Sequence, residues 1–389
     1  MSDHQETEER KISNQFVRAC AEGRHDDVLL MIAEGADVDQ FDKGFKEGDW
    51  QCTDGNEPNS FMQNGLQMAI RNKDMTLLRI LDQAGADFAF KEDKWIPDPE
   101  NEGKNKKAKV TADLLGDMAH AGFYEGFLYL LSHKGFTLPT DSDARGNLLL
   151  SAISGGSMDE CEESGSRFSL VEYLIDEQGF DVHYIDDRNR RPLSEAVGRE
   201  TDSAILKLVL NKGVDPNYDN RVVAKYKISF SDMFKDSVDD QMPGGFSLFE
   251  RMGNVMKKYR NTPLSEAVFN AVMYCGREDE QQDSETEQYL AELSPTERER
   301  EQQRMAKYRV RQKEIAGYSL EKVKMLLEHG ADPYFKDNDG VCAMDYFYDD
   351  DAIEMGLVRG EAAKVVEGIL QDWIDGKRDK PAQPKPYLN

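Results

Sequence analysis

One phrase recurs six times along this chain and limits what it can fold into. Each copy places apolar residues at i, i+3 and i+4, then a glycine, a small or apolar residue and, in five copies, an aspartate. The marker glycines are Gly35, Gly85, Gly135, Gly179, Gly213 and Gly330. The apolar spacing predicts one buried helix face, the glycine a left-handed residue that closes the helix, and the aspartate a turn. The chain is therefore expected to be a series of helical repeats that each end in the same turn.

The repeats also share a first helix with its own signature. Residues 191–197 (Arg-Pro-Leu-Ser-Glu-Ala-Val) and 262–268 (Thr-Pro-Leu-Ser-Glu-Ala-Val) are nearly identical. Looser versions occur at 64–70 and 147–153. Proline suits the first helical position, and the small alanine lets paired helices approach closely. Because such helices bury their apolar sides only against the next pair, the predicted fold class is all-α, with Leu264 and Ala267 buried between repeats.

Together these residues resemble the ankyrin-repeat family, whose pattern is Thr-Pro-Leu-His-x-Ala followed by Gly-Ala-Asp, with a period of about 33 residues. The resemblance covers about 12–374 and implies a solenoid of about seven helix pairs, the last one lacking the glycine ending like a terminal cap. We expect the array to span 12–376, between flexible tails at 1–11 and 377–389. The irregular, insertion-rich array is similar to bacterial or viral ankyrin proteins.

The sequence departs from the family pattern in two ways. The motif histidine is replaced by Ser194, Ser265 and Gln67, which predicts a weaker local hydrogen-bond pattern. The spacing is also irregular, since only the step from Gly179 to Gly213 is close to the family period. Extra length gathers in five predicted insertions, at about 40–62, 90–110, 155–167, 219–260 and 277–317.

Three of these insertions, 40–62, 90–110 and 219–260, follow the aspartate, where an ankyrin repeat makes its hairpin finger. The resemblance implies that the fingers line the concave side, and insertions on one face often mark the binding face. Tryptophan and tyrosine are enriched among the residues that dominate interface energies. The candidate partner-binding residues are Phe45, Trp50, Phe61, Trp95, Tyr226, Phe230 and Phe246. The alternative is that these aromatics pack the long loops onto the solenoid.

Inside the insertion at 277–317, Ser294-Pro295-Thr-Glu297 is a good helix start. It predicts an extra charged helix of about twenty residues, near 30 Å long, that acts as a strut or arm. Basic islands at 104–109 and 188–191 are predicted to lie in loops. Local charge balance is their simplest role, and binding of an acidic ligand is the alternative.

Charge and cysteine content limit the partners and the location. The formal net charge of −26 disfavours direct binding to nucleic acid or to anionic membranes, and favours capture of a basic protein. The alternative is that the acidity only keeps a long surface soluble. Five dispersed cysteines without CxxC spacing fit a reducing compartment, and no apolar run reaches the ~18 residues of a membrane span. We expect a cytoplasmic protein, and secretion as an effector stays open.

The sequence holds no pattern that predicts catalysis. It lacks a glycine-rich phosphate loop and an HExxH motif, and its six histidines are dispersed. We therefore expect no enzyme, no catalytic residues, no cofactor and no metal. The predicted function is a non-enzymatic scaffold that inhibits or sequesters a basic protein, as an immunity protein does. Three alternatives stay open: a secreted effector that captures a host protein, an acidic mimic of nucleic acid, and a cryptic enzyme built from the insertions.

Overall fold

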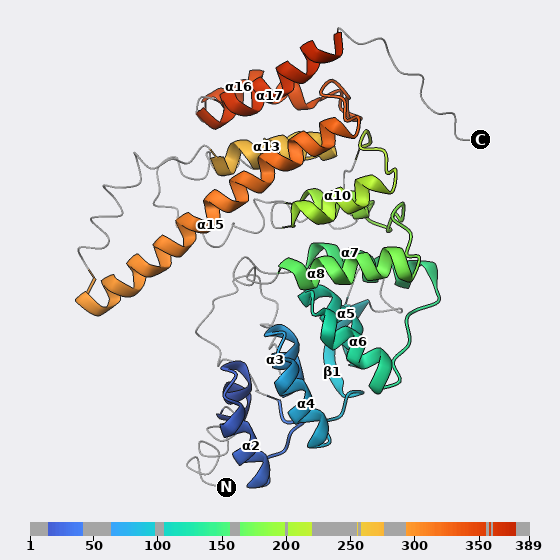
Figure 1. Cartoon of the computed structure of the whole chain (residues 1–389), viewed down its shortest axis with the longest axis vertical. Helices are drawn as coiled ribbons and strands as arrows, with labels where there is room; N and C mark the ends of the chain where they lie inside the picture. The colour runs from blue at the N-terminus through green and yellow to red at the C-terminus, as the bar shows by residue number, and fades with distance from the viewer. Residues whose placement is uncertain are drawn as a thin grey trace. The chain divides into compact units, whose positions relative to one another are not determined.

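A computed structural model describes the mostly helical parts of the chain (Figure 1), and these confirm the expected all-α character. The described residues are 15–41, 64–97, 105–155, 164–198, 201–219, 255, 258–275, 293–354, 358 and 361–378. The chain divides into two compact units, Met1–Phe180 and Asp181–Asn389, called here the N-terminal and C-terminal units. Among the described helices, none is long and apolar enough to cross a membrane.

The N-terminal unit has two layers of helices. Its elements are a helix at 15–21, α2 (His25–Ala33), α3 (Gly65–Arg71), α4 (Met75–Gln83), β1 (Lys91–Pro97), β2 (Asn105–Thr111), α5 (Leu114–Ala121), α6 (Tyr124–His133), α7 (Ser142–Ser154) and α8 (Ser164–Glu172), which continues as a π-helical turn (Tyr173–Glu177). First helices pack on first helices, α3 on α5 and α5 on α7, while α2, α4, α6 and α8 pack in order as the second layer. Each helix pair is thus covered by the next.

The C-terminal unit repeats this arrangement. Its elements are α9 (Pro192–Val197), α10 (Ser203–Asn211), α13 (Pro263–Cys275), α15 (Pro295–Glu328), the 3-10 helix η3 (Ala343–Tyr348), α16 (Asp350–Glu354) and α17 (Glu361–Arg378). In the first layer α9 packs on α13 and α13 on η3, and in the second α10 packs on α15 and α15 on α17. Helix α17 ends two residues beyond the predicted array. The remaining residues of both predicted tails lie outside the described residues.

The six marker glycines close their helices as predicted. All six have a positive φ, between 65° at Gly179 and 93° at Gly330. After five of them the aspartate side chain accepts the N–H two residues later, which closes a local turn. These aspartates are Asp37, Asp87, Asp181, Asp215 and Asp332. The second residue after the aspartate can also join neighbouring turns, since Asn217 Oδ1 accepts the N–H of Asp332 at 2.8 Å.

Ser194 and Ser265, which stand where the motif of the resemblance has a histidine, make local hydrogen bonds, while the predicted weakening relative to a histidine stays a prediction. Ser194 Oγ accepts the N–H of Arg191 and donates to its carbonyl, both at 2.9 Å. Ser265 Oγ makes the same two bonds to Thr262, both at 3.0 Å. A hydroxyl can donate and accept at once, so one serine oxygen makes both bonds.

The extra charged helix is longer than predicted and is not a separate strut. Helix α15 runs for 34 residues from Pro295 to Glu328, about 51 Å at 1.5 Å per residue. It therefore joins the predicted insertion to the second helix of its pair. No proline follows Pro295 within it, and Gly317 lies in open space, so nothing ends the helix between the two. Its N-terminal half extends beyond α13 (Figure 1).

The insertion at 90–110 forms an antiparallel hairpin of β1 and β2. The N–H of Ala112 donates to the carbonyl of Phe90 at 3.0 Å and closes the hairpin base. The basic island at 104–109 was predicted to lie in a loop, but from Asn105 onward it lies on β2, because regular pairing with β1 holds it extended. The predicted insertions 40–62, 155–167 and 219–260 lie mostly outside the described residues. Of the insertion 277–317, the structure describes residues 293–317.

Leu264 and Ala267 are buried as predicted, with 3% and 1% of their surface exposed. We expect Leu264→Ala to lower the free energy of unfolding by about 2–5 kcal/mol, because it leaves a cavity between helix pairs. The matched control is Leu30→Ala, at a leucine 58% exposed, which should change it by less than about 0.5 kcal/mol. Urea unfolding measures both, and similar values for the two variants would contradict the placement of Leu264.

Two glycines of the C-terminal unit separate backbone strain from packing. Gly330 has φ +93°, Gly368 lies inside α17, and an added Cβ would touch nothing within 4 Å at either position. Gly330→Ala should therefore destabilise the protein by about 1–2 kcal/mol through left-handed strain, whereas Gly368→Ala should stabilise it by up to about 1 kcal/mol. Thermal melts of both variants test this, and a neutral Gly330→Ala would contradict the role of this glycine.

Candidate functional site: the finger row and the inner charge cluster

Two turns of the C-terminal unit, 186–190 and 337–341, share one construction. In each, a leading aspartate accepts two N–H groups through Oδ1: Asp186 from residues 188 and 190, and Asp337 from residues 339 and 341, at 2.7–2.9 Å. Near the end of each turn stands a left-handed residue, Asn189 or Gly340. With Asp219, these two turns are called the finger row.

Asp219 joins the two turns. Its carbonyl accepts Asn189 Nδ2 at 3.3 Å, and its Oδ2 accepts the N–H of Asn338 at 2.9 Å. Asn261, just after the predicted insertion 219–260, donates Nδ2 to Asp337 Oδ2 at 2.8 Å. Both ends of this insertion therefore bind to the finger row. Three candidate residues, Tyr226, Phe230 and Phe246, belong to the insertion and lie outside the described residues.

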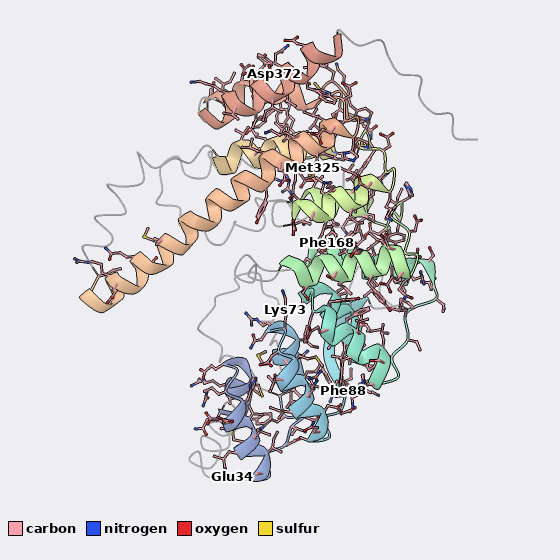
Figure 2. The ribbon with its side chains drawn as sticks, viewed as in Figure 1. Glu34, Lys73, Phe88, Phe168, Met325 and Asp372 are labelled. Carbon is pink, nitrogen blue, oxygen red and sulfur yellow. The ribbon has the colours of Figure 1, made fainter. Side chains whose placement is uncertain are left out.

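In the N-terminal unit the first two insertions begin side by side. Phe41 and Phe90 meet edge to face with 5.6 Å between ring centroids. Phe90 and Phe88, the latter labelled in Figure 2, are buried, so these two aromatics at the start of the second insertion pack onto the unit, while the packing alternative for the seven candidates stays untested. The candidates Phe45, Trp50 and Phe61 lie outside the described residues, and Trp95 is placed by its backbone alone, in β1.

A group of charged side chains lies close to the finger row, and we call it the inner charge cluster: Glu195, Glu266, Arg190, Arg260 and Lys322. Glu195 on α9 and Glu266 on α13 hold the same motif position on packed helices. Arg260 Nη2 donates to Glu266 Oε1 at 2.6 Å, whereas Arg190 Nε pairs with Asp186 at 2.7 Å. The Glu195 carboxylate makes no hydrogen bond or ion pair to a residue that the structure describes, while the Glu195 carbonyl accepts from Thr201 Oγ1 at 3.0 Å.

Glu195 is consequently a half-buried carboxylate without a direct cation. Burial raises its pKa above the ordinary value, Glu266 and Asp186 raise it further, and only Arg190 opposes them. Asp186 shows the contrast: burial alone would raise its pKa, but N–H bonds and the Arg190 guanidinium hold it below the ordinary value. A cation brought to Glu195 would relieve this unfavourable environment.

Lys322 occupies the most enclosed position of the cluster. It lies on α15 one turn before Met325, labelled in Figure 2, and only 1% of it is exposed. Its Nζ donates to the carbonyl of Gly198 at 2.5 Å. Burial lowers its pKa to about 7, against the attraction of Glu266, Asp202 and Glu321.

In the basic island 188–191, two of the three arginine side chains contact neighbouring residues. This agrees with a local role for the island. Arg190 pairs with Asp186, and the Arg191 guanidinium lies 4.2 Å from the centroid of the Tyr218 ring. Sequence reasoning missed the inner charge cluster and named none of its residues as a candidate site. The sequence did carry one signal. The Glu of the repeated Ser-Glu-Ala motif stands between a serine near the start of a helix and an alanine expected to be buried.

The pH dependence of stability tests the enclosure of Lys322. Its folded pKa lies below the ordinary value of about 10.4, so the unfolded state binds more protons, and the free energy of unfolding should rise from about pH 7 to about pH 9. Lys322→Met should reduce this rise, while Lys324→Met, an exposed lysine on the same helix, should leave it intact. Urea unfolding across this range is the measurement, and equal slopes in both variants would contradict the enclosure.

The site can hold charge but offers no metal centre among the described residues, where no group of three or more His, Cys, Asp or Glu side chains could bind an ion. Its described groups are paired carboxylates and guanidiniums, one uncompensated carboxylate and an enclosed amine. No family model and no curated protein sequence matches the chain. The function is therefore inferred from this geometry and from the sequence.

Proposed function

We propose that this chain is a non-enzymatic, ankyrin-type scaffold that binds a basic protein through the finger row and inhibits or sequesters it. Support for the ankyrin type comes from the repeated motif, the left-handed glycines and the two-layer packing within each unit. An acidic surface speeds the capture of a basic partner by electrostatic steering. A role as an immunity-type inhibitor fits these properties, and a secreted effector would use the same surface.

The observation that carries the proposal is Glu195. Among the described residues, no cation pairs directly with this half-buried carboxylate, which lowers stability, and such a loss of stability is expected where function needs it. Beside the finger row, Glu195 can receive a lysine or arginine from a partner, and the partly buried setting makes such a pair stronger than one on open surface. The insertion 219–260, whose two ends bind to the finger row, supplies further candidate residues for the partner.

A cytoplasmic location belongs to the same proposal. Cys20 and Cys342 are buried free thiols, and burial raises the pKa of both. Both therefore stay protonated and unreactive at neutral pH. These two thiols suit a reducing compartment, in which a basic intracellular protein would be the target.

Glu195→Gln is the direct test. The chain is isolated from its native cells after crosslinking, the partner is identified by mass spectrometry, and its affinity is measured by calorimetry. We expect a basic partner whose affinity falls about tenfold or more in Glu195→Gln, which corresponds to at least ~1.4 kcal/mol. The free energy of unfolding of Glu195→Gln at neutral pH should stay the same or rise. A carboxyl group whose pKa is raised by folding destabilises the folded protein as the pH rises through that pKa, and glutamine does not ionise.

Glu328→Gln serves as the matched control, since Glu328 is exposed at the end of α15. It removes the same charge away from the finger row and should keep the affinity. An acidic partner, or equal affinities for both variants, would overturn the proposal.

A further inference from the structure

We propose that the β1–β2 hairpin is a second, oppositely charged binding surface that takes an acidic, extended peptide segment. This goes beyond the proposed function, because it concerns another unit and another class of ligand. The inference starts from strand register, which pairs Trp95 with Lys107 and Asp93 with Lys109.

Register places three of the five lysines and the tryptophan on one face. Residues of a strand alternate between faces, while directly paired residues share a face. One face therefore carries Lys91, Asp93 and Trp95, opposite Thr111, Lys109 and Lys107. We call this the lysine face. The other face carries Ile96, Ala108 and Val110 with Glu92, Lys94 and Lys106.

Burial shows which face meets solvent. Lys91, Lys109 and Thr111 of the lysine face are exposed, whereas Ala108 and Val110 of the other face are half-buried. The apolar side of the hairpin is thus partly covered, and the lysine face is open to a ligand. Trp95 holds a position on that open face.

The charge of the hairpin opposes that of the chain. Its two strands contain five lysines and two acidic residues, within a protein of net charge −26. Local charge balance explains one of these lysines, Lys109, through its cross-strand position opposite Asp93. Lys107 stands in register opposite Trp95, so no acidic residue holds the position directly across from it.

The sheet also provides backbone edges. It has two strands, so each strand has one edge without a neighbour in this sheet, and such edges can bind an extended peptide by strand addition. Lysines on edge strands also discourage self-association. A purely protective role does not account for a tryptophan on the same open face, whereas ligand binding does, because tryptophan supplies contact area for an interface.

An acidic peptide fits these features better than nucleic acid. Single-stranded nucleic acid binds along basic grooves with successive aromatic platforms, and the lysine face offers one aromatic position. A short segment with glutamate or aspartate side chains needs only the few lysines that the face provides.

Lys106 and Lys107 allow a sharp test, because they are adjacent in sequence and lie on opposite faces. The probe is a fluorescein-labelled hexaglutamate peptide, followed by fluorescence anisotropy with the full chain at about 0.15 M salt, where charges beyond about 8 Å are screened. We expect binding that weakens about tenfold in Lys107→Glu and in Trp95→Ala, but less than about threefold in Lys106→Glu. Unchanged melting temperatures would show that the variants remain folded.

Three outcomes would overturn the inference. They are no binding of hexaglutamate, equal weakening by Lys106→Glu and Lys107→Glu, and tighter binding of an octathymidine oligonucleotide than of the peptide. Glu195→Gln should bind hexaglutamate like the unaltered chain. A negative result with hexaglutamate would therefore not contradict the proposed binding of a basic protein. A negative result with the basic protein would not contradict peptide binding at the hairpin.

Discussion

Burial of apolar helix faces between successive helix pairs is the interaction on which the rest of the structure depends. Helix α9 has six residues and α3 seven, lengths at which an isolated helix is unstable in water. The motif leucines Leu66, Leu193 and Leu264 are each no more than 3% exposed. The small motif alanines are equally enclosed and allow the close approach of packed helices. Each helix therefore persists because its neighbours cover it.

Short helices place many unpaired backbone groups at their ends, and the chain satisfies them locally. Left-handed glycines, aspartate turns and the Ser194 and Ser265 bonds close each end within a few residues. Local closure makes insertions tolerable. One insertion begins after Phe90 and ends before Ala112, and a hydrogen bond between these two residues closes its base. Another begins after Asp219 and ends before Asn261, and both of these residues bind to the finger row. Since loop-closure entropy grows slowly with length, long insertions cost the repeats little.

Local patterns predicted the helix ends and the core, and features that depend on distant residues escaped. The glycine conformations and the burial of Leu264 and Ala267 follow from spacing within a few residues. The length of α15 was not predicted, because the repeated phrase suggested that a new helix begins after the insertion. No residue between Pro295 and Glu328 ends a helix. The environment of Glu195 depends on Arg190, Glu266 and Asp186, and the fold brings Glu266 to it from the next helix pair. The seven predicted aromatics stay untested as binding residues.

Two buried charges in one cluster have different physical explanations. Lys322 is almost fully enclosed, so it cannot reach a partner. Its ammonium donates to the carbonyl of Gly198, which caps the C-terminal end of α9, where a cation is favoured by the helix dipole. Lys322 thereby contributes to the fold. The Glu195 carboxylate has no such bond to a residue that the structure describes, and it remains half-exposed beside the finger row. The fold accounts for the lysine but leaves the carboxylate unexplained, and an external cation is the simplest group that would account for it.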